Sequence, residues 1–419
     1  MSFSVDRLRG MQDVLPPSGG LWSKIERVAR DIASFYGFSY VRTPVLEFTE
    51  LFERSVGDCS DIVQKEMYTF NDKSGRSVTM RPEFTAGVLR AVVSGLTSSP
   101  YPLKLMYFGP CYRYEKPQAG RLREFFQFGL EIFGSKSHMA DIELISATDK
   151  ILRDLRISNF HLDINAVGCS KCRKNYLDHI KSFFSDNSSL LCKTCFERLT
   201  RNPLRIFDCK NEGCRKLFKD APKTIDFVCD ECHSYFENLK KSLNVLKIPY
   251  VVNPLVVRGL DYYTKFVFEF IDSTNLTICG GGRYDDLSSN LGGIDLPATG
   301  LAVGVERLIK LLNLDEKYDD ENASAIYIAC ANEKYSNTVL SMVCELRDLG
   351  IKCDYDIVGR SLKSQMRFAD KTNCRFSTVI GDNEIKNKKL IVKKMSTGEE
   401  HSFDLDGFAS EFLSYTKSF

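Results

Sequence analysis

The clearest hydrophobic pattern in the chain runs along residues 107–134. From 126 to 132 every second side chain is apolar, while the positions between them include Gln127 and Glu131. A second apolar run precedes it, and a polar loop with proline and glycine joins the two. Alternation of period two on both sides of such a loop predicts an antiparallel hairpin. By default its basic tip is a solvated loop; the tip carries Arg113, Lys116, Arg121 and Arg123.

Helical spacing of apolar residues occurs in the same half of the chain. Residues 21–35 carry it, with two prolines and a serine ahead and Gly37 behind, and this combination predicts an amphipathic helix. Residues 39–48 predict a strand that Pro44 places at an edge or interrupts. A strand that becomes a helix after Pro82, and a further helix over 138–155, are predicted next.

Glycines and acidic residues divide the second half. Strand patterns occupy 250–271, and 298–312 predict a strand that leads into a helix. Between them, three consecutive glycines in 276–287 favour a tight turn over a phosphate cradle, so a turn-rich segment is expected. The acidic stretch 313–324 predicts a linker.

Beyond this linker, strand and helix patterns alternate, which predicts a small parallel βαβαβ domain over 325–419. Residues 386–394 contain five lysines and no acidic residue. Lysines protect the edges of exposed sheets, and the same side chains supply contacts to the phosphates of a polyanion. Both interpretations apply to this run.

Composition places the chain among ordinary globular proteins. Its 419 residues allow two or three domains, and 43% hydrophobic with 27% charged residues is typical of a soluble protein. The net charge of +2 excludes a global attraction to nucleic acid or membrane, so any polyanion must be held by local patches. The N-terminus lacks the apolar core of a signal peptide, and no apolar run would span a bilayer. We therefore expect a cytoplasmic protein without membrane contact.

Cysteine is concentrated in one region. Eight of the fifteen cysteines lie between 169 and 232, within a stretch (169–245) that carries 15 Lys and Arg against 10 Asp and Glu. This stretch predicts an inserted module of different character. In a reducing compartment metal binding outranks disulfides, and eight thiols suffice for two tetrahedral zinc sites. Structural zinc and unliganded thiols both remain open, and so does the pairing of Cys169, Cys172, Cys192, Cys195, Cys209, Cys214, Cys229 and Cys232.

Phosphate chemistry, if present, must use arginine side chains. Neither the GxxxxGK[ST] phosphate loop nor a GxGxxG fingerprint in a βαβ unit occurs in the sequence. Arginine holds phosphate oxygens with a planar fork of N–H donors. Three arginines fall beside apolar strands, although each alone is more often part of a structural ion pair; they are Arg113, Arg258 and Arg307.

The strings around these arginines resemble a known family. "GPCYRYEKPQAGRLREFFQ" and "GLAVGVERL" resemble motifs 2 and 3 of the class II aminoacyl-tRNA synthetases, and "YGFSYVRTPVLE" resembles motif 1. "LVVRGLDYYTKFVFEF" and "CGGGRYDDL" resemble the two peptides peculiar to the bacterial-type histidyl-tRNA synthetases. The resemblance extends over essentially the whole chain, from "RGMQDVLPP" to the C-terminal α/β domain.

The resemblance implies a fold of mixed α/β and α+β class. A class II catalytic domain with an antiparallel sheet would occupy 1–320, with the inserted module at about 169–245. The C-terminal βαβαβ domain, 325–419, would bind the anticodon. The implied reaction joins L-histidine to tRNA(His) through histidyl-adenylate, with ATP as substrate, Mg²⁺ on its outer phosphates and a homodimer formed through motif 1.

Site residues follow from the same resemblance. Arg258 and Arg113 would carry the catalytic charge at the α-phosphate, and Gln118 would contact the first base pair of the tRNA. The ATP site would consist of Arg113, Glu115, Arg121, Arg123, Phe125 and Arg307. "MRPEFTAG" resembles the substrate loop, although many members carry glycine where this chain has Phe84. The histidine site would consist of Glu83, Thr85, Arg113, Gln127, Glu131, Arg258, Tyr262, Tyr263 and Tyr284.

Two other functions are compatible with this family of folds. One is the synthetase-like regulatory subunit of histidine biosynthesis, which is not an enzyme; such paralogs typically lack the anticodon domain and the intact "RGLDYY" and motif 2, all of which this chain has. The other is a synthetase for another amino acid, such as proline or threonine, against which the two histidine-specific peptides argue.

Overall fold

The computed structural model describes residues 6–16, 18–57, 60, 62–116, 121–201, 203–209, 211–256, 260, 262–312 and 325–417. Arg258, Gln118 and the acidic stretch 313–324 lie outside these described residues. The chain divides into two compact units, Met1–Glu316 and Lys317–Phe419. Each unit has a sheet and a hydrophobic core of its own.

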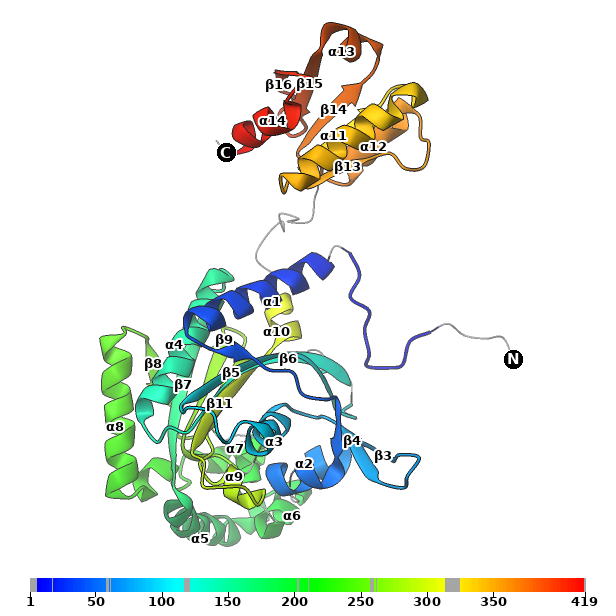
Figure 1. Cartoon of the computed structure of the whole chain (residues 1–419). Helices are drawn as coiled ribbons and strands as arrows, with labels where there is room; N and C mark the ends of the chain where they lie inside the picture. Colours follow the sequence, from blue (N-terminus) through cyan, green and yellow to red (C-terminus); the bar gives the residue numbers. More distant parts are fainter. Residues whose placement is uncertain are drawn as a thin grey trace. The chain divides into compact units, whose positions relative to one another are not determined.

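The first unit is built on an eight-stranded, mainly antiparallel sheet (Figure 1). The outermost pairs, β1 with β5 and β7 with β8, run parallel, and the pairs between them run antiparallel. The antiparallel catalytic sheet expected from the sequence is therefore confirmed. In sheet order the strands are β1 (Ser39–Tyr40), β5 (Leu103–Tyr112), β6 (Glu124–Phe133), β11 (Ala298–Gly304), β10 (Thr277–Arg283), β9 (Thr264–Asp272), β7 (Phe160–Gly168) and β8 (Tyr250–Val252).

The predicted hairpin is confirmed as β5 and β6, and its alternation separates two faces of the sheet. Phe126 meets Trp22 of α1 (Ser18–Phe35) edge to face, with ring centroids 4.8 Å apart. Because successive side chains of a strand point to opposite faces, Gln127 and Glu131 lie on the other face. The glutamate inside the strand thus lies on the face opposite α1.

Helices cover this sheet on both faces. α1, α4 (His138–Asp154) and α8 (Asp230–Val245) pack beside one another on the first face. α3 (Thr85–Gly95) packs against β5 on the second face, where its Val88, Leu89 and Val92 join the core that contains Leu105 and Tyr107. The helices predicted at 21–35 and 138–155 are confirmed as α1 and α4, and α3 follows Pro82 as predicted.

The strand predicted at 39–48 is interrupted. β1 pairs with β5 in the large sheet, whereas β2 (Leu46–Phe48) pairs with β4 (Ser77–Met80) in a small sheet that β3 (Tyr68–Asn71) completes. Pro44 lies between the two pieces. Its missing N–H and fixed φ suit such a break.

The prediction of a turn-rich segment at the three glycines is wrong. Residues Thr277–Arg283 form β10, which pairs with β9 on one side and β11 on the other. A Cβ on Gly281 would lie 2.4 Å from the carbonyl oxygen of Gly300, and one on Gly282 would lie 2.4 Å from that of Phe266. The glycines serve close packing within a central strand, a requirement that arises from distant parts of the chain.

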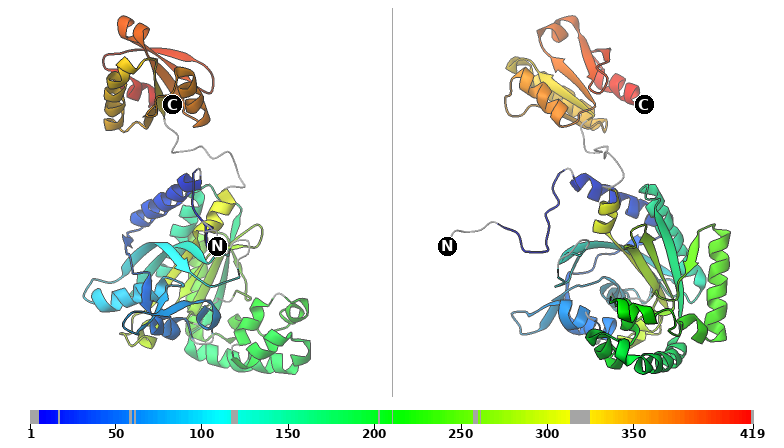
Figure 2. Two further views of the ribbon diagram at one scale, coloured as in Figure 1. Left: turned by 90° about the vertical axis from the view of Figure 1, so that its right-hand side faces the viewer. Right: turned by 180° about the vertical axis from the view of Figure 1, so that it is seen from behind.

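Between β7 and β8 the chain forms a helical insertion. It begins with α5 (Ser170–Asp186), α6 (Lys193–Arg201) and α7 (Glu212–Leu217) and ends with α8. Figure 2 shows these helices, in green, gathered beside the sheet. Tyr176, Ile180 and Phe184 of α5 form a small separate core with Leu217 and Phe218.

The second unit contains a five-stranded sheet in the order β13, β12, β14, β15, β16. The first three strands are parallel, which confirms the predicted βαβαβ arrangement, and an antiparallel hairpin extends it. The strands are β12 (Ile326–Cys330), β13 (Cys353–Tyr355), β14 (Phe376–Ile380), β15 (Lys389–Lys394) and β16 (Glu400–Asp404). The helices are α11 (Ser336–Asp348), α12 (Leu362–Lys371), α13 (Asp382–Asn387) and α14 (Phe408–Thr416).

The lysine run of this unit does not form the edge of its sheet. β15 lies between β14 and β16, so the interpretation as a protected sheet edge is wrong. Lys389 and Lys393 are exposed, while Leu390 and Val392 between them are buried. The lysines therefore form the solvated side of an internal strand. Across both units, none of the helices in the described ranges is long and apolar enough to cross a membrane.

Candidate active site

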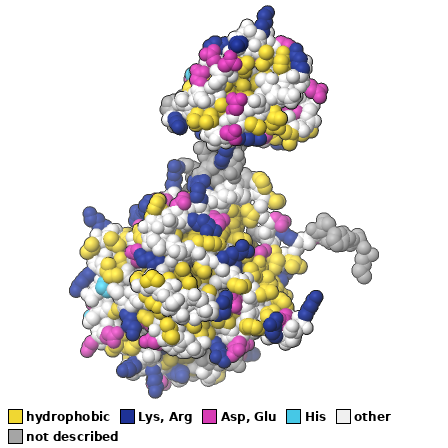
Figure 3. All heavy atoms as spheres, in the orientation of Figure 1, with side chains coloured by type: hydrophobic (Ala, Val, Ile, Leu, Met, Phe, Trp, Pro, Cys, Tyr) yellow, Lys and Arg dark blue, Asp and Glu magenta, His cyan; other side chains and the backbone are white. Residues whose placement is uncertain are grey.

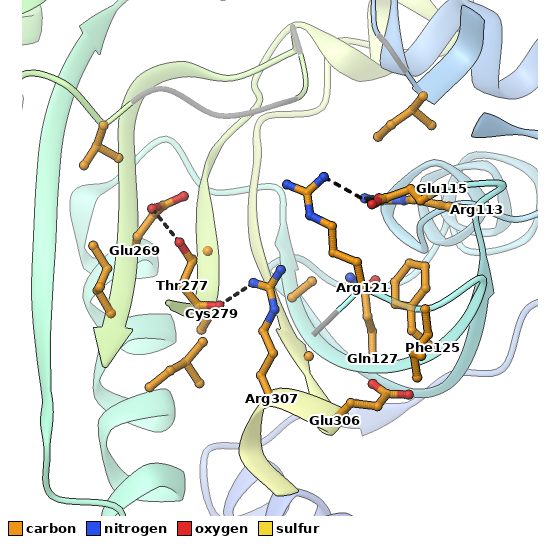
Figure 4. A pocket seen from close by; sticks show the side chains of 18 of the residues that line it. Arg113, Glu115, Arg121, Phe125, Gln127, Glu269, Thr277, Cys279, Glu306 and Arg307 are labelled. Atoms are coloured by element: carbon orange, nitrogen blue, oxygen red, sulfur yellow. Dashed lines mark hydrogen bonds and ion pairs between the residues drawn. The ribbon is translucent and has the colours of Figure 1, made fainter. Parts of the chain in front are cut away.

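An open cavity of about 750 Å³ lies at the end of the β5–β6 hairpin (Figure 4). Nine of the residues that line it are charged, and several of these come from positions far apart in the sequence. Five of the residues expected to bind ATP line the cavity: Arg113, Glu115, Arg121, Phe125 and Arg307. Gln127, which is expected in the histidine site, lines the cavity as well.

Arg113 is held in place from several sides. Its Nε donates to the carbonyl oxygen of Pro82 at 2.9 Å. Its guanidinium carbon lies 5.2 Å from the centroid of the Phe125 ring, within range of a cation–π contact. The carboxylate of Glu115 lies 3.9 Å from Nη1. The charge of this arginine is thus positioned before any ligand arrives.

The opposite wall carries Arg307, at the start of α10 (Val305–Leu312). Its Nη1 donates to the carbonyl of Thr277, and the Thr277 hydroxyl donates to Glu269 at 3.1 Å (Figure 4). Arg121 pairs with Glu115 at 3.2 Å on the other side of the cavity. Arginine forks therefore reach the cavity from both sides.

Arg123 differs from the other arginines of the hairpin, since it is not among the cavity's lining residues. Its guanidinium carbon lies 3.9 Å from the Tyr114 ring centroid, and its Nε donates to the Glu115 carbonyl at 3.3 Å. These contacts support the loop segment that carries Glu115.

Glu306 lines the cavity next to Arg307. Burial raises the pKa of its carboxyl to about 7, and this effect outweighs the hydrogen bond it accepts from the Phe126 N–H at 2.8 Å. Near neutral pH the Glu306 carboxyl is therefore only partly ionised.

Deeper along the same strand face is a buried polar cluster built around Glu131, whose side chain is fully buried. Its carboxyl accepts from the Thr85 hydroxyl at 2.8 Å and from the Tyr284 hydroxyl. Burial raises the pKa of Glu131 to about 8, although both hydroxyl donors oppose the shift. Without a ligand the protonated form is favoured at neutral pH.

Glu83 lies beside this cluster at the start of α3. Its carboxyl accepts the backbone N–H groups of Thr85 and Ala86 at 2.7 and 2.9 Å. Burial raises the pKa of Glu83, and the two N–H donors and Arg113 partly offset this shift. Tyr262 packs on Tyr263 and meets Tyr284, with ring centroids 4.7 and 5.5 Å apart.

A glycine on β11 makes room for the buried glutamate. A Cβ on Gly300 would lie 1.4 Å from Glu131 Oε2 and 2.9 Å from the Tyr284 hydroxyl. No side chain fits there while Glu131 keeps this position. The glycine therefore fixes the place of the carboxyl as firmly as its hydrogen bonds do.

The sequence missed several lining residues. Arg198 of α6 and Arg205 of the 3₁₀ segment Pro203–Asp208 reach the cavity from the insertion, and Glu66 and Glu269 add carboxylates. Glu269 had a recognisable signal, because it is the one acidic residue inside the apolar run 266–271. The two arginines had none, since they belong to none of the motifs and reach the site through the tertiary fold.

The eight cysteines of the insertion are brought together in two groups of four. Cys169, Cys172, Cys229 and Cys232 form one group. Cys192, Cys195, Cys209 and Cys214 form the other. The spacing left this pairing open, and the structure gives one arrangement.

Comparison with known proteins agrees with this geometry. The family model described as histidyl-tRNA synthetase matches residues 10–172 and 212–308, and an anticodon binding domain model matches 325–415. A protein named histidine--tRNA ligase from Clostridium botulinum (strain Loch Maree / Type A3) is 46% identical, covering 96% of this chain and 97% of its own length. One of the same name from Caldicellulosiruptor bescii is 45% identical, covering 97% of each chain.

A solved structure is similar over the same extent. The crystal structure of apo histidyl-tRNA synthetase from S. aureus matches with a TM-score of 0.80 and 34% identity, covering 98% of this chain and 100% of that one. The long similarity at this identity, together with the matched family model, leaves one assignment: the chain belongs to the histidyl-tRNA synthetase family.

Proposed function

We propose that this chain is an ATP-dependent histidine–tRNA ligase, which forms histidyl-adenylate and transfers the histidyl group to the 3′ end of tRNA(His). The observation that carries the proposal is the arrangement along one face of β6. Gln127 opens onto the arginine-lined cavity, and Glu131, four residues further on, lies in the buried tyrosine cluster. A polyphosphate site and a site for a small polar ring thus adjoin on one strand.

In the first step the histidine carboxylate attacks the α-phosphorus of ATP. A carboxylate oxygen–phosphorus bond forms, the bond to the bridging oxygen breaks, and pyrophosphate leaves. No protein base is needed, because the carboxylate is already ionised at neutral pH. Two anions must approach each other, so cations fixed around them lower the barrier. Arg113 suits this role because its guanidinium is held by Pro82 and Phe125.

The remaining nucleotide contacts follow the wall of the cavity. Phe125 would stack on the adenine beside Glu115, and Arg307 would hold the γ-phosphate of a bent ATP; Arg121 would reach the outer phosphates or the tRNA. Arg123, which the resemblance assigns to the ATP site, would act indirectly, through its hydrogen bond to the Glu115 carbonyl. Arg258, assigned by resemblance, would add a second cation at the α-phosphate.

Histidine would occupy the buried end. Glu83 and Gln127 would hold its α-amino group, with Glu131, Tyr263 and Tyr284 around the ring and Thr85 and Tyr262 supporting them. Because Glu131 is fully buried, its carboxyl would be left without a hydrogen-bond partner by an amino acid whose side chain lacks a matching N–H, and such an amino acid would bind more weakly. This end therefore supplies the selectivity of the reaction.

Magnesium fits the chemistry of the open end. Mg²⁺ usually combines one or two carboxylates with substrate phosphates and water. Glu66, Glu115 and Glu269 offer such carboxylates in the wall. When bound, the ion neutralises charge on the outer phosphates, while the arginines hold the α-phosphate.

The second substrate is recognised at two places. The motif 2 loop, through Gln118, would contact the first base pair of the acceptor end, and the second unit would bind the anticodon. On the face shown in Figure 3, lysine and arginine side chains of the first unit are dispersed among apolar and acidic ones. Because the net charge of the chain is only +2, contacts to the tRNA phosphates would rely on local groups such as the lysines of β15.

We further propose a homodimer whose interface is formed by the motif 1 region and α1. Several aromatic side chains there are exposed, among them Phe35 at 82% and Phe48 at 56%. Phe35 ends the apolar stripe of α1, and β1 lies at the edge of the large sheet. A second copy would cover these side chains.

We also propose that the protein works in the cytoplasm. The eight cysteines of the insertion form no disulfide, which suits the reducing conditions of that compartment.

The decisive experiment is ATP–pyrophosphate exchange with the full-length protein and each of the twenty amino acids in turn. We expect exchange with histidine alone. Exchange with none of them would favour a regulatory subunit, and exchange with another amino acid would reassign the substrate.

A further inference from the structure

The two cysteine groups of the insertion have the dimensions of metal sites. In each group the four Sγ atoms lie within 4.8 Å of one another. A tetrahedral zinc ion with Zn–S bonds of about 2.3 Å places its sulfur ligands about 3.8 Å apart. The Sγ atoms of Cys169 and Cys172 are 3.6 Å apart, and those of Cys192 and Cys209 are 3.8 Å apart. A disulfide needs about 2.05 Å, and all eight cysteines are free.

Backbone N–H groups are aimed at the sulfur atoms. The N–H of Cys192 donates to Cys214 Sγ at 3.2 Å, and that of Cys229 to Cys172 Sγ at 3.1 Å. The N–H of Asn211 donates to Cys209 Sγ at 3.4 Å. Donors of this kind stabilise the thiolate form, which is the form that binds metal, and orient it. Both groups thus have an ordered surrounding layer as well as four ligands.

The surrounding chain fits a compact, charged site. A Cβ on Gly168, which has φ +72°, would lie 2.4 Å from Cys172 Cβ, so the chain passes closely over the first group. Four thiolates around Zn²⁺ carry a net charge of −2. The stretch 169–245 holds 15 Lys and Arg against 10 Asp and Glu, an excess that offsets two such charges.

We propose that each group binds one Zn²⁺ through four thiolates, so that the full chain carries two structural zinc ions. The first group joins the residue before α5 to the residue before α8 and holds the two ends of the insertion together. The second group pins α6 and α7 inside it. A small core gains most from such cross-links, because it buries little apolar surface of its own.

The second ion has a consequence for the cavity, and this part rests on the proposed function. Its ligands Cys195 and Cys209 bracket the segment that carries Arg198 and Arg205, both of which line the cavity. Arg198 Nη1 donates to the Arg205 carbonyl at 2.9 Å, which ties the two together. The matches of the family model leave out residues 173–211, which contain this whole segment and three of the four ligands of the second group. We infer that the second zinc positions these two cations on the ATP site.

Metal content of the full-length protein tests the zinc sites directly. Protein purified in metal-free buffer with EDTA should retain two zinc ions per chain by mass spectrometry, with four sulfur neighbours at about 2.3 Å in X-ray absorption. The double variants Cys169→Ser/Cys172→Ser and Cys192→Ser/Cys195→Ser should each retain one. Cys344→Ser, an exposed cysteine of α11, should retain two.

Variants that fail to fold do not weaken this test. In the wild-type chain, titration of the thiols with an organomercurial should release two zinc ions as the eight cysteines react, followed with a zinc-sensitive dye. A folded protein without tightly held zinc, or with nitrogen or oxygen neighbours in place of sulfur, would overturn the proposal. One ion per chain would overturn the two-site arrangement.

The positioning role has a separate readout. Arg198→Gln/Arg205→Gln should raise the KM for ATP several-fold in histidine-dependent pyrophosphate exchange, with zinc content and the KM for histidine unchanged. Cys192→Ser/Cys195→Ser should raise the same KM and lose one zinc. An unchanged KM for ATP in the arginine variant would overturn the positioning role while leaving the zinc sites intact. Absence of exchange in the wild type would instead overturn the proposed function.

Discussion

The two ends of the β6 face present opposite environments. At the open end, arginines and glutamates share a cavity of about 750 Å³, and Arg121 is paired with Glu115 at 3.2 Å before a ligand is present. At the closed end, Glu131 is fully buried and burial raises its pKa to about 8. At the open end arginine and carboxylate side chains pair with one another, whereas burial at the closed end favours a neutral carboxyl.

Because of this contrast, substitutions at the two ends should differ in how they affect the reaction rate and the stability of the fold. An exposed arginine can be removed with little effect on folding, since surface ion pairs contribute about 0–1 kcal/mol. A buried group cannot, because its partners lose their hydrogen bonds. Substitutions at the open end should therefore change catalysis, and those at the closed end should change catalysis and folding together.

The largest effect is expected at the open end, from Arg113→Ala. Loss of one preorganised cation at the reacting phosphate should lower kcat/KM for ATP in pyrophosphate exchange about 10²- to 10³-fold. Loss of the hydrogen bond to the Pro82 carbonyl should cost only about 0.5–1.5 kcal/mol of stability. Arg76→Ala is the matched control, because Arg76 is an exposed arginine paired with Asp72 away from the cavity. Rates within about tenfold of wild type would exclude Arg113 from the reacting centre.

At the closed end, Glu131→Gln should raise the KM for histidine about ten- to hundredfold, the equivalent of about 1–3 kcal/mol for a mismatched buried hydrogen bond. The KM for ATP should change little, because Glu131 is not part of the cavity wall. Glu50→Gln, at an exposed glutamate of α2 (Thr49–Val56), serves as the control. Equal changes in both KM values would indicate a purely structural role.

Gly300→Ala should damage the closed end without removing any functional group. Its Cβ would lie 1.4 Å from Glu131 Oε2, so the carboxyl must move away from Thr85 and Tyr284. We expect a loss of about 1–3 kcal/mol in the free energy of unfolding by urea denaturation, as for other overpacked interiors. Gly19→Ala, in α1, is the control: its added Cβ would meet no other side chain or strand within 4 Å, so the free energy of unfolding should not fall. A variant as stable as wild type would show that the closed end is softer than its packing indicates.

Titration sharpens the same contrast. Because burial raises the pKa of Glu131 from its ordinary value of 4.5 to about 8, folding favours the protonated form. Its contribution to stability is complete below about pH 4.5 and is lost as the pH rises through about 8. Between these values the wild-type free energy of unfolding should fall relative to that of Glu131→Gln, by at most about 1.4 kcal/mol per pH unit. Parallel curves for the two proteins would contradict the shift.

The smallest effect on adenylate formation is expected from removal of the second unit. A chain that ends at Glu316 retains every described residue of the open cavity and of the buried cluster around Glu131. Histidine-dependent exchange should therefore be unchanged. Charging of tRNA(His) should fall, and sensitivity to the anticodon should disappear. Sensitivity to the first base pair of the acceptor end, which the motif 2 loop would contact through Gln118, should persist. Full charging by the shortened, folded protein would remove the anticodon role.

Local pattern predicted the elements whose partners are near in sequence. The β5–β6 hairpin, α1 and α4 followed from period and capping alone, and Glu131 stood out as an acid inside an alternating strand. The three glycines of β10 were misjudged, because the crowding that requires them comes from Phe266 and Gly300 on other strands. Arg198 and Arg205 were missed for the same reason. Contacts across the sheet and through the insertion have no local signature.

The arrangement of the cysteine groups also sets an order of assembly during synthesis. All ligands of the second group, ending at Cys214, precede Cys229 and Cys232, so the first group stays incomplete until the ribosome has passed both. The second group also closes the shorter loop, which costs less chain entropy. A chain that grows from its N-terminus can therefore fix α6 and α7 first, and only afterwards join the start of α5 to the start of α8.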